Sequence, residues 1–219
     1  MQTLKQRILP FCLMLSIPII TIIYQHLNNP LGVVHSLVTN LDEGIPFLKI
    51  FILPYLGFYL YVFLTLCYFC LKDRKTYYKT LVAINISYLF CFLIYYFFQT
   101  SVPRPYLYDQ GLLSTLVSMV FRLDNPYNTF PSIHVLTSYL MIKAINRCSN
   151  RNKQNVVLVY CVSILIIIST MFVKQHVIFD AVSAILLGDL VFETVYYLSE
   201  VGGTIVKHPV FFNFGRGRA

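Results

Sequence analysis

Charged residues are scarce in this chain of 219 residues. Only 12% are Asp, Glu, Lys or Arg, whereas 57% are hydrophobic. Soluble domains carry about 25% charged residues, so this composition and the mean hydropathy of +0.67 argue against a soluble domain. The chain also lacks Trp, which leaves its 17 Tyr to occupy the membrane–water interface. We therefore expect an integral membrane protein whose non-protein partners include membrane lipids.

Several site types are also missing from the sequence. It contains no P-loop and no carboxylate cluster arranged for magnesium. The pair Cys67 and Cys70 has no second Cys or His pair nearby, so neither a metal site nor a disulfide is expected. The net charge of +8 follows membrane topology, as argued below, so no nucleic-acid partner is expected. The sequence contains no internal repeat and no segment of different composition, so residues 1–219 are expected to form a single domain. No cofactor is expected.

Six stretches are long and apolar enough, or nearly so, to cross a bilayer. A spanning helix needs about 20 apolar residues, and the candidates cover residues 8–27, 46–71, 79–100, 131–147, 155–174 and 176–199. The fourth is short and moderately polar. Residues 112–123 are too short to span and predict an amphipathic helix lying along the interface. The expected fold is all-α: six transmembrane helices, with this interfacial helix between helices three and four.

The positions of the cations predict the orientation. Lys and Arg gather before the first span, in residues 72–79 and 143–153, and after the sixth span at Lys207, Arg216 and Arg218. By the positive-inside rule both termini are cytoplasmic, which agrees with an even number of spans. Residue usage rich in Ile, Tyr and Asn and poor in Ala is typical of an AT-rich bacterial source. We therefore expect a bacterial plasma membrane, with the loops 28–45 and 101–130 on the extracytoplasmic face.

Three short motifs meet on that extracytoplasmic face, each where an apolar segment joins a loop. They are Arg104-Pro105, Pro131-Ser132-Ile133-His134, and the segment from His176 to Asp180. Ionisable residues at a membrane face are costly, and they mark a functional site by default. The candidate site residues are Arg104, Ser132, His134, Lys174, His176 and Asp180.

The spacing of these residues suits phosphoryl transfer. His176 and Asp180 are four residues apart and share a helix face, so Asp180 can orient the imidazole and leave its other nitrogen as a nucleophile. Ser132 and His134 follow Pro131 at a predicted helix N-terminus, which attracts phosphate. Arg104 and Lys174 could neutralise phosphate oxygens, although Lys174 could equally extend its amine to the interface.

The three motifs together resemble those of the type 2 phosphatidic acid phosphatase superfamily: K-x6-R-P, P-S-G-H and S-R-x5-H-x3-D on a six-helix membrane fold. Arg104-Pro105 matches the first, residues 131–134 the second, and Ser169 with His176 and Asp180 the third. The chain departs from the motifs at three positions, which hold Phe97, Ile133 and Thr170 in place of Lys, Gly and Arg. The aliphatic Ile133 and the segment 42–47 are more similar to the inositol phosphorylceramide synthase-like branch.

The resemblance implies a role for each site residue. His176 would form a phosphohistidine, Asp180 would orient it, and His134 would protonate the leaving alkoxide. Ser132, Arg104 and Lys174 would hold the phosphate. The implied substrate is a lipid phosphate or polyprenyl (di)phosphate, hydrolysed by a lipid phosphate phosphatase. One alternative is a phosphotransferase that moves lipid headgroups, and a second is a non-catalytic lipid-binding or transport protein.

Four further charged residues are expected to lie outside this site. Asp189 is about 20 Å from His176 along a helix, so Asp189 and Glu193 are expected to hydrogen-bond between helices, with Asn85 or Ser87 as partners. Arg122 and Asp124 are expected to form a solvated loop pair. The sequence does not indicate an oligomeric state.

Overall fold

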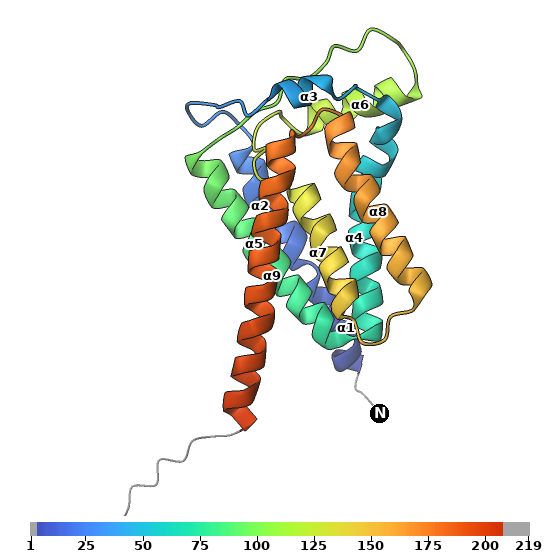
Figure 1. Ribbon diagram of the computed structural model, residues 1–219, viewed down its shortest axis with the longest axis vertical. Coiled ribbons are helices and arrows are strands. Elements are labelled where there is room, and N and C mark those ends of the chain that lie inside the picture. Colours follow the sequence, from blue (N-terminus) through green and yellow to red (C-terminus); the bar gives the residue numbers. More distant parts are fainter. Residues whose placement is uncertain (1–3, 208–219) are drawn as a thin grey trace, which may run out of the picture.

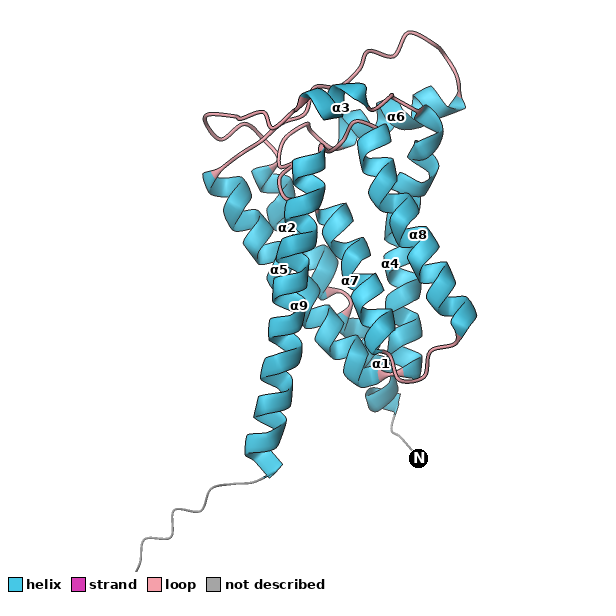
Figure 2. Cartoon of the chain, viewed as in Figure 1, coloured by secondary structure: helices cyan, strands magenta, loops and turns pink. Residues whose placement is uncertain are grey.

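The computed structural model describes residues 4–207, with side chains described from residue 8 to residue 201. Every regular element in that range is a helix (Figure 2), which confirms the all-α expectation. The helices form an upright bundle whose long connections gather at one end, here called the loop end (Figure 1). The predicted cytoplasmic cations Arg216 and Arg218 lie outside the described residues.

The first predicted span is broken into two helices, α1 (Leu4–Leu13) and α2 (Ser16–Leu27). Pro18 explains the break, because a proline has no N–H for the carbonyl four residues earlier and its ring clashes with that carbonyl. That carbonyl belongs to Met14, and it accepts instead from the Ile17 N–H at 3.1 Å. The apolar segment Ile8–Leu27 confirms the bounds of the predicted span, and the helix within it is interrupted at residues 14–15.

The second and third predicted spans form two helices that are joined by a single residue. The short helix η1 (Lys49–Phe51) leads into α4 (Ile52–Lys72), and Asp73 alone separates α4 from α5 (Arg74–Phe97). The Asp73 side chain accepts from the Thr76 N–H at 3.1 Å and so caps α5. This cap starts α5 five residues before the predicted start at residue 79, within the basic segment.

The helix α7 (Ile133–Arg147) lies at the centre of the bundle and packs against α4, α5, α8 and α9. Its neighbours α8 (Lys153–Phe172) and α9 (Ile178–Lys207) follow in sequence. The lower half of α9 projects beyond the other helices (Figure 1). Six apolar side chains of α7 are fully buried: Val135, Leu136, Leu140, Met141, Ala144 and Ile145.

Among the described residues, four segments are long and apolar enough to cross a membrane: Ile8–Leu27, Lys49–Lys72, Arg74–Phe97 and Lys153–Phe172. These segments indicate an integral membrane protein. The remaining two of the six predicted spans correspond to α7 and α9. With 15 residues, α7 is about 22 Å long, and α9 carries Asp189 and Glu193 along its length. Six spans therefore stays a prediction.

Two short helices cover the loop end of the bundle, α3 (Asn40–Gly44) and α6 (Leu112–Leu123) (Figure 1). The bounds of α6 are those predicted for the amphipathic helix. Its inward face carries Ser114, Val117 and Val120, at the three-residue spacing of one helix face, and it packs on Ile52 and Tyr55 of α4. This packing closes the bundle over the region where the motifs lie.

At the opposite end, ion pairs connect α7 to α9. Lys143 Nζ lies 2.7 Å from Asp189 Oδ1 and 2.5 Å from Glu193 Oε1, and Arg147 reaches Glu193 Oε2 at 2.9 Å. Asp189 also accepts from the Tyr139 hydroxyl. The two carboxylates thus connect helices as expected, but the predicted partners were wrong: Asn85 donates instead to Ser16 and to the Leu81 carbonyl.

Candidate active site

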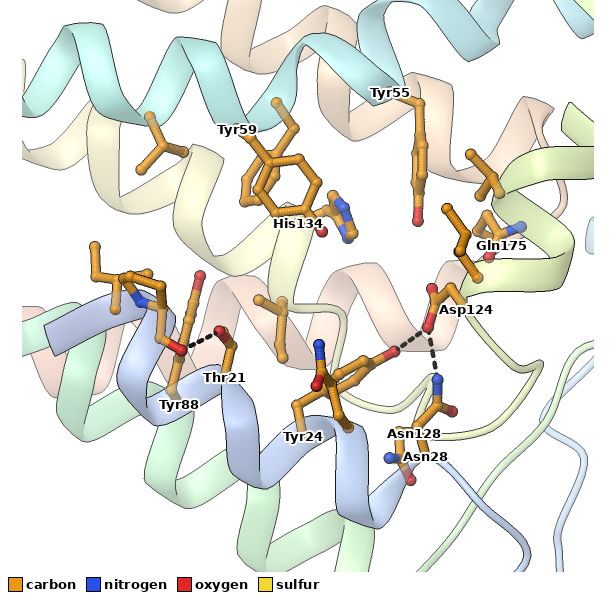
Figure 3. Close-up of a pocket in the computed structure, with 18 of the residues that line it drawn as sticks. Thr21, Tyr24, Asn28, Tyr55, Tyr59, Tyr88, Asp124, Asn128, His134 and Gln175 are labelled. Atoms are coloured by element: carbon orange, nitrogen blue, oxygen red, sulfur yellow. Dashed lines mark hydrogen bonds between the residues drawn. The ribbon is translucent and has the colours of Figure 1, made fainter. Parts of the chain in front are cut away.

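A cavity of about 800 Å³ extends from the loop end into the middle of the bundle. It lies between α2 and α4, with α7 along one side (Figure 3). Toward the interior its walls are apolar, lined by Met14, Phe58, Val62 and Leu66. At the loop end they are polar, lined by Asn28, Arg104, Asp124, Asn128, His134, Gln175 and His176. Such a shape suits a molecule with an apolar chain and a polar head.

His176 lines the polar end and is held by two oxygen atoms. Its Nδ1 lies 2.9 Å from the Thr129 carbonyl oxygen and 3.3 Å from Asp180 Oδ2. Both partners are acceptors, so Nδ1 carries the proton and Nε2 is the unprotonated nitrogen of the neutral ring. Asp180 is fully buried, and its Oδ2 also accepts from the Val177 N–H at 3.0 Å. The predicted pairing of His176 with Asp180 is therefore present, and the Thr129 carbonyl shares the Nδ1 proton at the shorter distance.

His134 lines the same cavity from the first turn of α7. Its ring stacks on Tyr55 at 4.6 Å between centroids and packs on Phe58 at 4.4 Å, which fixes its orientation (Figure 3). The ring centroids of His134 and His176 are 6.1 Å apart. His134 Nε2 is buried and has no hydrogen-bond partner among the described residues. The structure thus brings together the two histidines that the sequence placed about 40 residues apart.

Arg104 reaches the cavity from the loop after α5. Its guanidinium donates to the Phe121 carbonyl at 2.8 Å and to Gln175 Oε1 at 3.0 Å, and it packs over the Phe121 ring. Burial lowers the pKa of this guanidinium, and the nearby Asp124 carboxylate opposes the shift. Arg104 is therefore a desolvated cation in a fixed position at the polar end.

Gln175 is a site residue that sequence reasoning missed. Its side chain is 5% exposed and lines the cavity, and its Nε2 is a buried donor that finds no partner in the part of the chain that the structure describes. The only sequence signal is its place directly before His176. Gln175 Oε1 accepts from Arg104, so a cation and an amide group with a free donor lie side by side at this end of the cavity and suit an anion.

Lys174 and Ser132 were predicted to bind phosphate, and neither lines the cavity. Lys174 has a left-handed backbone with φ of 56°, and its Nζ donates to the Asp42 carbonyl at 2.8 Å. Ser132 is fully buried as the N-cap of α7, with Oγ 3.4 Å from the Val135 N. Its own N–H donates to the Asp180 carbonyl at 3.2 Å. Both residues thus contact the framework around His176.

The segment α3 holds the start of α9. Asp42 Oδ1 accepts from the Ile178 N–H at 2.8 Å, and its Oδ2 accepts from Thr39. Although burial raises the pKa of Asp42, these hydrogen bonds and the charge of Lys174 bring it below its ordinary value. The carboxylate therefore stays ionised and fixes the turn that carries His176.

Asp124 is not the solvated loop residue that the sequence suggested. Its Oδ1 accepts from the Tyr24 hydroxyl and from Asn28 Nδ2, both at 2.7 Å, and the side chain lines the cavity (Figure 3). Burial raises the pKa of Asp124 and outweighs the opposing effects of Tyr24, Arg104 and His176. The prediction was wrong because Asp124 meets α2, about 100 residues earlier, and no local pattern reports such a contact.

The fold and the site define a helical membrane protein whose amphipathic cavity contains a histidine–carboxylate pair, a second histidine and an arginine. Residues 25–192 match the PAP2 superfamily, and the chain belongs to that superfamily. The match confirms the family that the three motifs indicated, at the level of the superfamily and not of a branch. Membership suggests lipid phosphate phosphatase-type activity. Searches of curated proteins and of solved structures found no match.

Of the three departures from the family motifs, Ile133 lines the cavity, whereas Phe97 and Thr170 do not. Phe97 is 76% exposed at the end of α5, and Thr170 is buried with its hydroxyl on the Ile167 carbonyl. Within residues 8–201, no group of three or more His, Cys, Asp or Glu side chains is arranged to hold a metal ion.

Proposed function

We propose that the protein is a phosphatase that hydrolyses a lipid phosphate or a polyprenyl (di)phosphate through a phosphohistidine on His176. One observation carries the proposal. The Thr129 carbonyl and Asp180 both bind Nδ1 of His176, which leaves Nε2 as the nucleophilic nitrogen in a cavity where other buried donors have no partner. Donors that face a developing anion supply the stabilisation that phosphoryl transfer needs.

The first step is attack on the phosphate. Nε2 of His176 forms a bond to phosphorus as the bond from phosphorus to the leaving oxygen breaks, and His134 gives that oxygen a proton. Arg104 and Gln175 Nε2 hold the phosphate oxygens, while Asp180 stabilises the positive charge that develops on the imidazole. His134 suits the acid role because its ring is fixed by Tyr55 and Phe58 and its Nε2 has no other partner.

The second step returns the enzyme to its starting state. A water molecule attacks phosphorus, the bond to His176 Nε2 breaks, and His134 takes a proton from the water. Inorganic phosphate leaves with its full complement of oxygen atoms. No step needs a metal ion or a cofactor, because Arg104 and the buried donors supply the charge compensation.

The apolar half of the cavity would hold the lipid chain, and the site would face away from the cytoplasm. The basic residues of the segments 72–79 and 143–153 lie at the end opposite the site, which agrees with the positive-inside rule. In this arrangement all six predicted spans cross the membrane, and both termini are cytoplasmic.

Lys174 and Ser132 take supporting roles in this proposal. Lys174 binds the Asp42 carbonyl, and Ser132 caps α7 and donates to the Asp180 carbonyl. These contacts hold the turn before α9 and the start of α7, and thereby the two histidines. Phosphate contact would then fall to Arg104 and Gln175 in place of the lysine and serine expected from the motifs.

The test uses purified protein in detergent with ³²P-labelled phosphatidic acid or polyprenyl diphosphate. We expect release of inorganic phosphate and a base-stable, acid-labile label on the protein. The variant His176→Ala should lose both, whereas His26→Ala, at an exposed histidine on α2, should keep both. Near wild-type turnover in folded His176→Ala would remove the assignment. A wild type that binds these lipids and turns none over would favour the non-catalytic alternative.

A further inference from the structure

The apolar half of the cavity has a closed end. Along α4 the cavity is lined at successive turns by Tyr55, Phe58, Val62 and Leu66, and the lining stops there. Phe69 continues the same face of α4 one turn further on, but it is fully buried in the core and does not line the cavity. The cavity therefore ends at Leu66, on the side away from the loop end.

The closed end is formed where the first span is interrupted, away from the loop end (Figure 1). α2 packs on α5, whereas α1 packs on α4, so the chain crosses from one side of the cavity to the other between these two helices. Met14 lies at this crossing, lines the cavity and is 8% exposed, and it belongs to the same buried cluster as Leu66, which is 1% exposed. Met14 and Leu66 are here called the floor.

Hydrogen bonds hold the crossing in place. Asn85 Nδ2 donates to Ser16 Oγ at 2.9 Å, at the start of α2, and the buried Tyr77 hydroxyl donates to the Pro10 carbonyl in α1. The helices on both sides of the interruption are thus bound to α5, which carries Asn85 and Tyr77. Because a packed interior also has low compressibility, the floor limits the length of a chain that lies above it.

The helix rise gives the depth from the histidines to the floor. Tyr55 stacks on His134 at 4.6 Å between centroids and therefore marks the polar end. Leu66 follows Tyr55 by eleven residues on α4, which corresponds to about 16 Å. An extended chain advances about 1.2 Å per bond, since the three backbone bonds of one residue span at most about 3.6 Å. About 13 bonds therefore reach from the polar end to the floor.

This depth distinguishes between the two kinds of chain that the proposed function allows. An unbranched alkyl chain of about a dozen carbons would fill the cavity from the histidines to the floor. A long polyprenyl chain exceeds that depth and carries methyl branches. It would have to bend out between α2 and α4, past Leu15 and Phe63, which are more than half exposed.

We propose that Met14 and Leu66 set the chain length of the substrate, which is a lipid phosphate whose unbranched chain extends about 12–14 atoms beyond the phosphate. The inference rests on the proposed phosphatase activity and adds to it the choice of an alkyl chain over a polyprenyl chain. A chain that just reaches the floor makes the most contacts with the cavity wall. A shorter chain leaves a void, and a longer chain must bend or displace packed side chains.

The experiment lets alkyl phosphates of different length compete. Purified protein in mixed detergent micelles receives equal amounts of dodecyl and hexadecyl phosphate, and the ratio of their kcat/KM values is obtained from the alcohols released. Both substrates share the same micelles, so differences in detergent or surface concentration cancel. For the wild type, kcat/KM for dodecyl phosphate should exceed that for hexadecyl phosphate by at least about fivefold, as expected for overfilling a packed site.

Three variants test the floor, with thermal unfolding recorded for each. Leu66→Ala and Met14→Ala each deepen the cavity, so each should lower the ratio by at least about threefold in favour of hexadecyl phosphate. Val62→Phe places a ring one turn nearer the histidines and should shift the preference from dodecyl toward octyl phosphate. Leu64→Ala is the matched control, because Leu64 is 55% exposed on α4 and does not line the cavity. It should leave the ratio unchanged.

Binding gives a second measurement that does not depend on turnover. Thermal stabilisation of His176→Ala by the same alkyl phosphates should follow the same order of chain lengths. That order in binding, without turnover by the wild type, would support the chain-length limit and reject the proposed phosphatase. Equal kcat/KM values for dodecyl and hexadecyl phosphate in the wild type would overturn the inference and leave the phosphatase intact. An unchanged ratio in both folded floor variants, or a preference for a polyprenyl phosphate over dodecyl phosphate, would also overturn it.

Discussion

The role of Asp180 can be tested with the variant Asp180→Asn. The contacts of Asp180 predict how far kcat should fall in this variant. Asn is nearly isosteric, and its oxygen can take the place of Oδ2, which accepts from Val177 N–H and lies 3.3 Å from His176 Nδ1. The Thr129 carbonyl lies closer to Nδ1, at 2.9 Å. The carbonyl alone therefore keeps the proton on Nδ1, and the variant retains the nucleophilic form of the ring.

What the variant loses is the negative charge next to the imidazole when that ring becomes positive. A hydrogen bond to a charged group contributes about 1.5–3 kcal/mol, so kcat should fall by about 10- to 150-fold. This loss is far smaller than the roughly 10⁴-fold expected when a carboxylate alone fixes the tautomer. In the variant the amide nitrogen replaces Asp180 Oδ1, which is buried without a hydrogen-bond partner among the described residues. A buried donor without a partner costs about 1–3 kcal/mol, so the variant should be less stable than the wild type by about that amount.

The assay is single-turnover release of ³²P-phosphate by the wild type, Asp180→Asn and His176→Ala in detergent, with thermal unfolding recorded for each. Asp109→Asn serves as a control for removal of a carboxylate away from the cavity. If folded Asp180→Asn is as inactive as His176→Ala, the carbonyl does not hold the tautomer. If its rate falls less than threefold, the charge of Asp180 contributes nothing to the transition state.

The remaining predictions concern the acid, the topology and a helix cap. His134→Ala should slow hydrolysis of a lipid phosphate more than that of an activated aryl phosphate, because only the poor leaving group needs a proton; equal losses would contradict the acid role. In a cysteine-free background, a cysteine replacing Tyr108, which is 92% exposed, should react with an impermeant thiol reagent in intact cells, and one replacing Asn152 should be protected; the reverse pattern would invert the topology. Asp73→Ala should destabilise the protein by about 1 kcal/mol through loss of the α5 cap. Burial raises the pKa of Asp73, but hydrogen bonds from Ser149 and Thr76 bring it to about 2, so this difference should hold above about pH 3.9 and shrink as the pH falls toward 2. A difference in melting temperature that does not shrink would refute it.

The parts of the site that the sequence predicted are those set by local geometry. The spacing of His176 and Asp180, and the place of His134 after Pro131 at a helix start, are properties of a few consecutive residues. The helix at residues 112–123 was likewise predicted with its observed bounds, because its apolar face repeats with the helical period. Once three such segments adjoin the same end of the bundle, their side chains meet.

The site residues that the sequence did not predict have a different physical origin. The choice between Lys174 and Gln175 as the residue that faces the cavity depends on one backbone angle, the φ of 56° at Lys174, which turns the lysine toward α3. No propensity predicts a left-handed lysine. Asp124 acquires its role only through contacts with α2, so it depended on tertiary structure that a single sequence does not display.

The apolar half of the cavity determines how the protein should meet its substrate. It lies between α2, which packs on α5, and α4, and residues on its rim such as Leu15 and Phe63 are more than half exposed. If the helices cross the bilayer as proposed, this side of the cavity would face hydrocarbon, and the proposed lipid substrate would enter sideways without first leaving the membrane. The concentration that governs its rate is then the mole fraction of substrate in the surface. Adding inert detergent at fixed total substrate should slow turnover by surface dilution, and a water-soluble phosphate ester should show no such dependence.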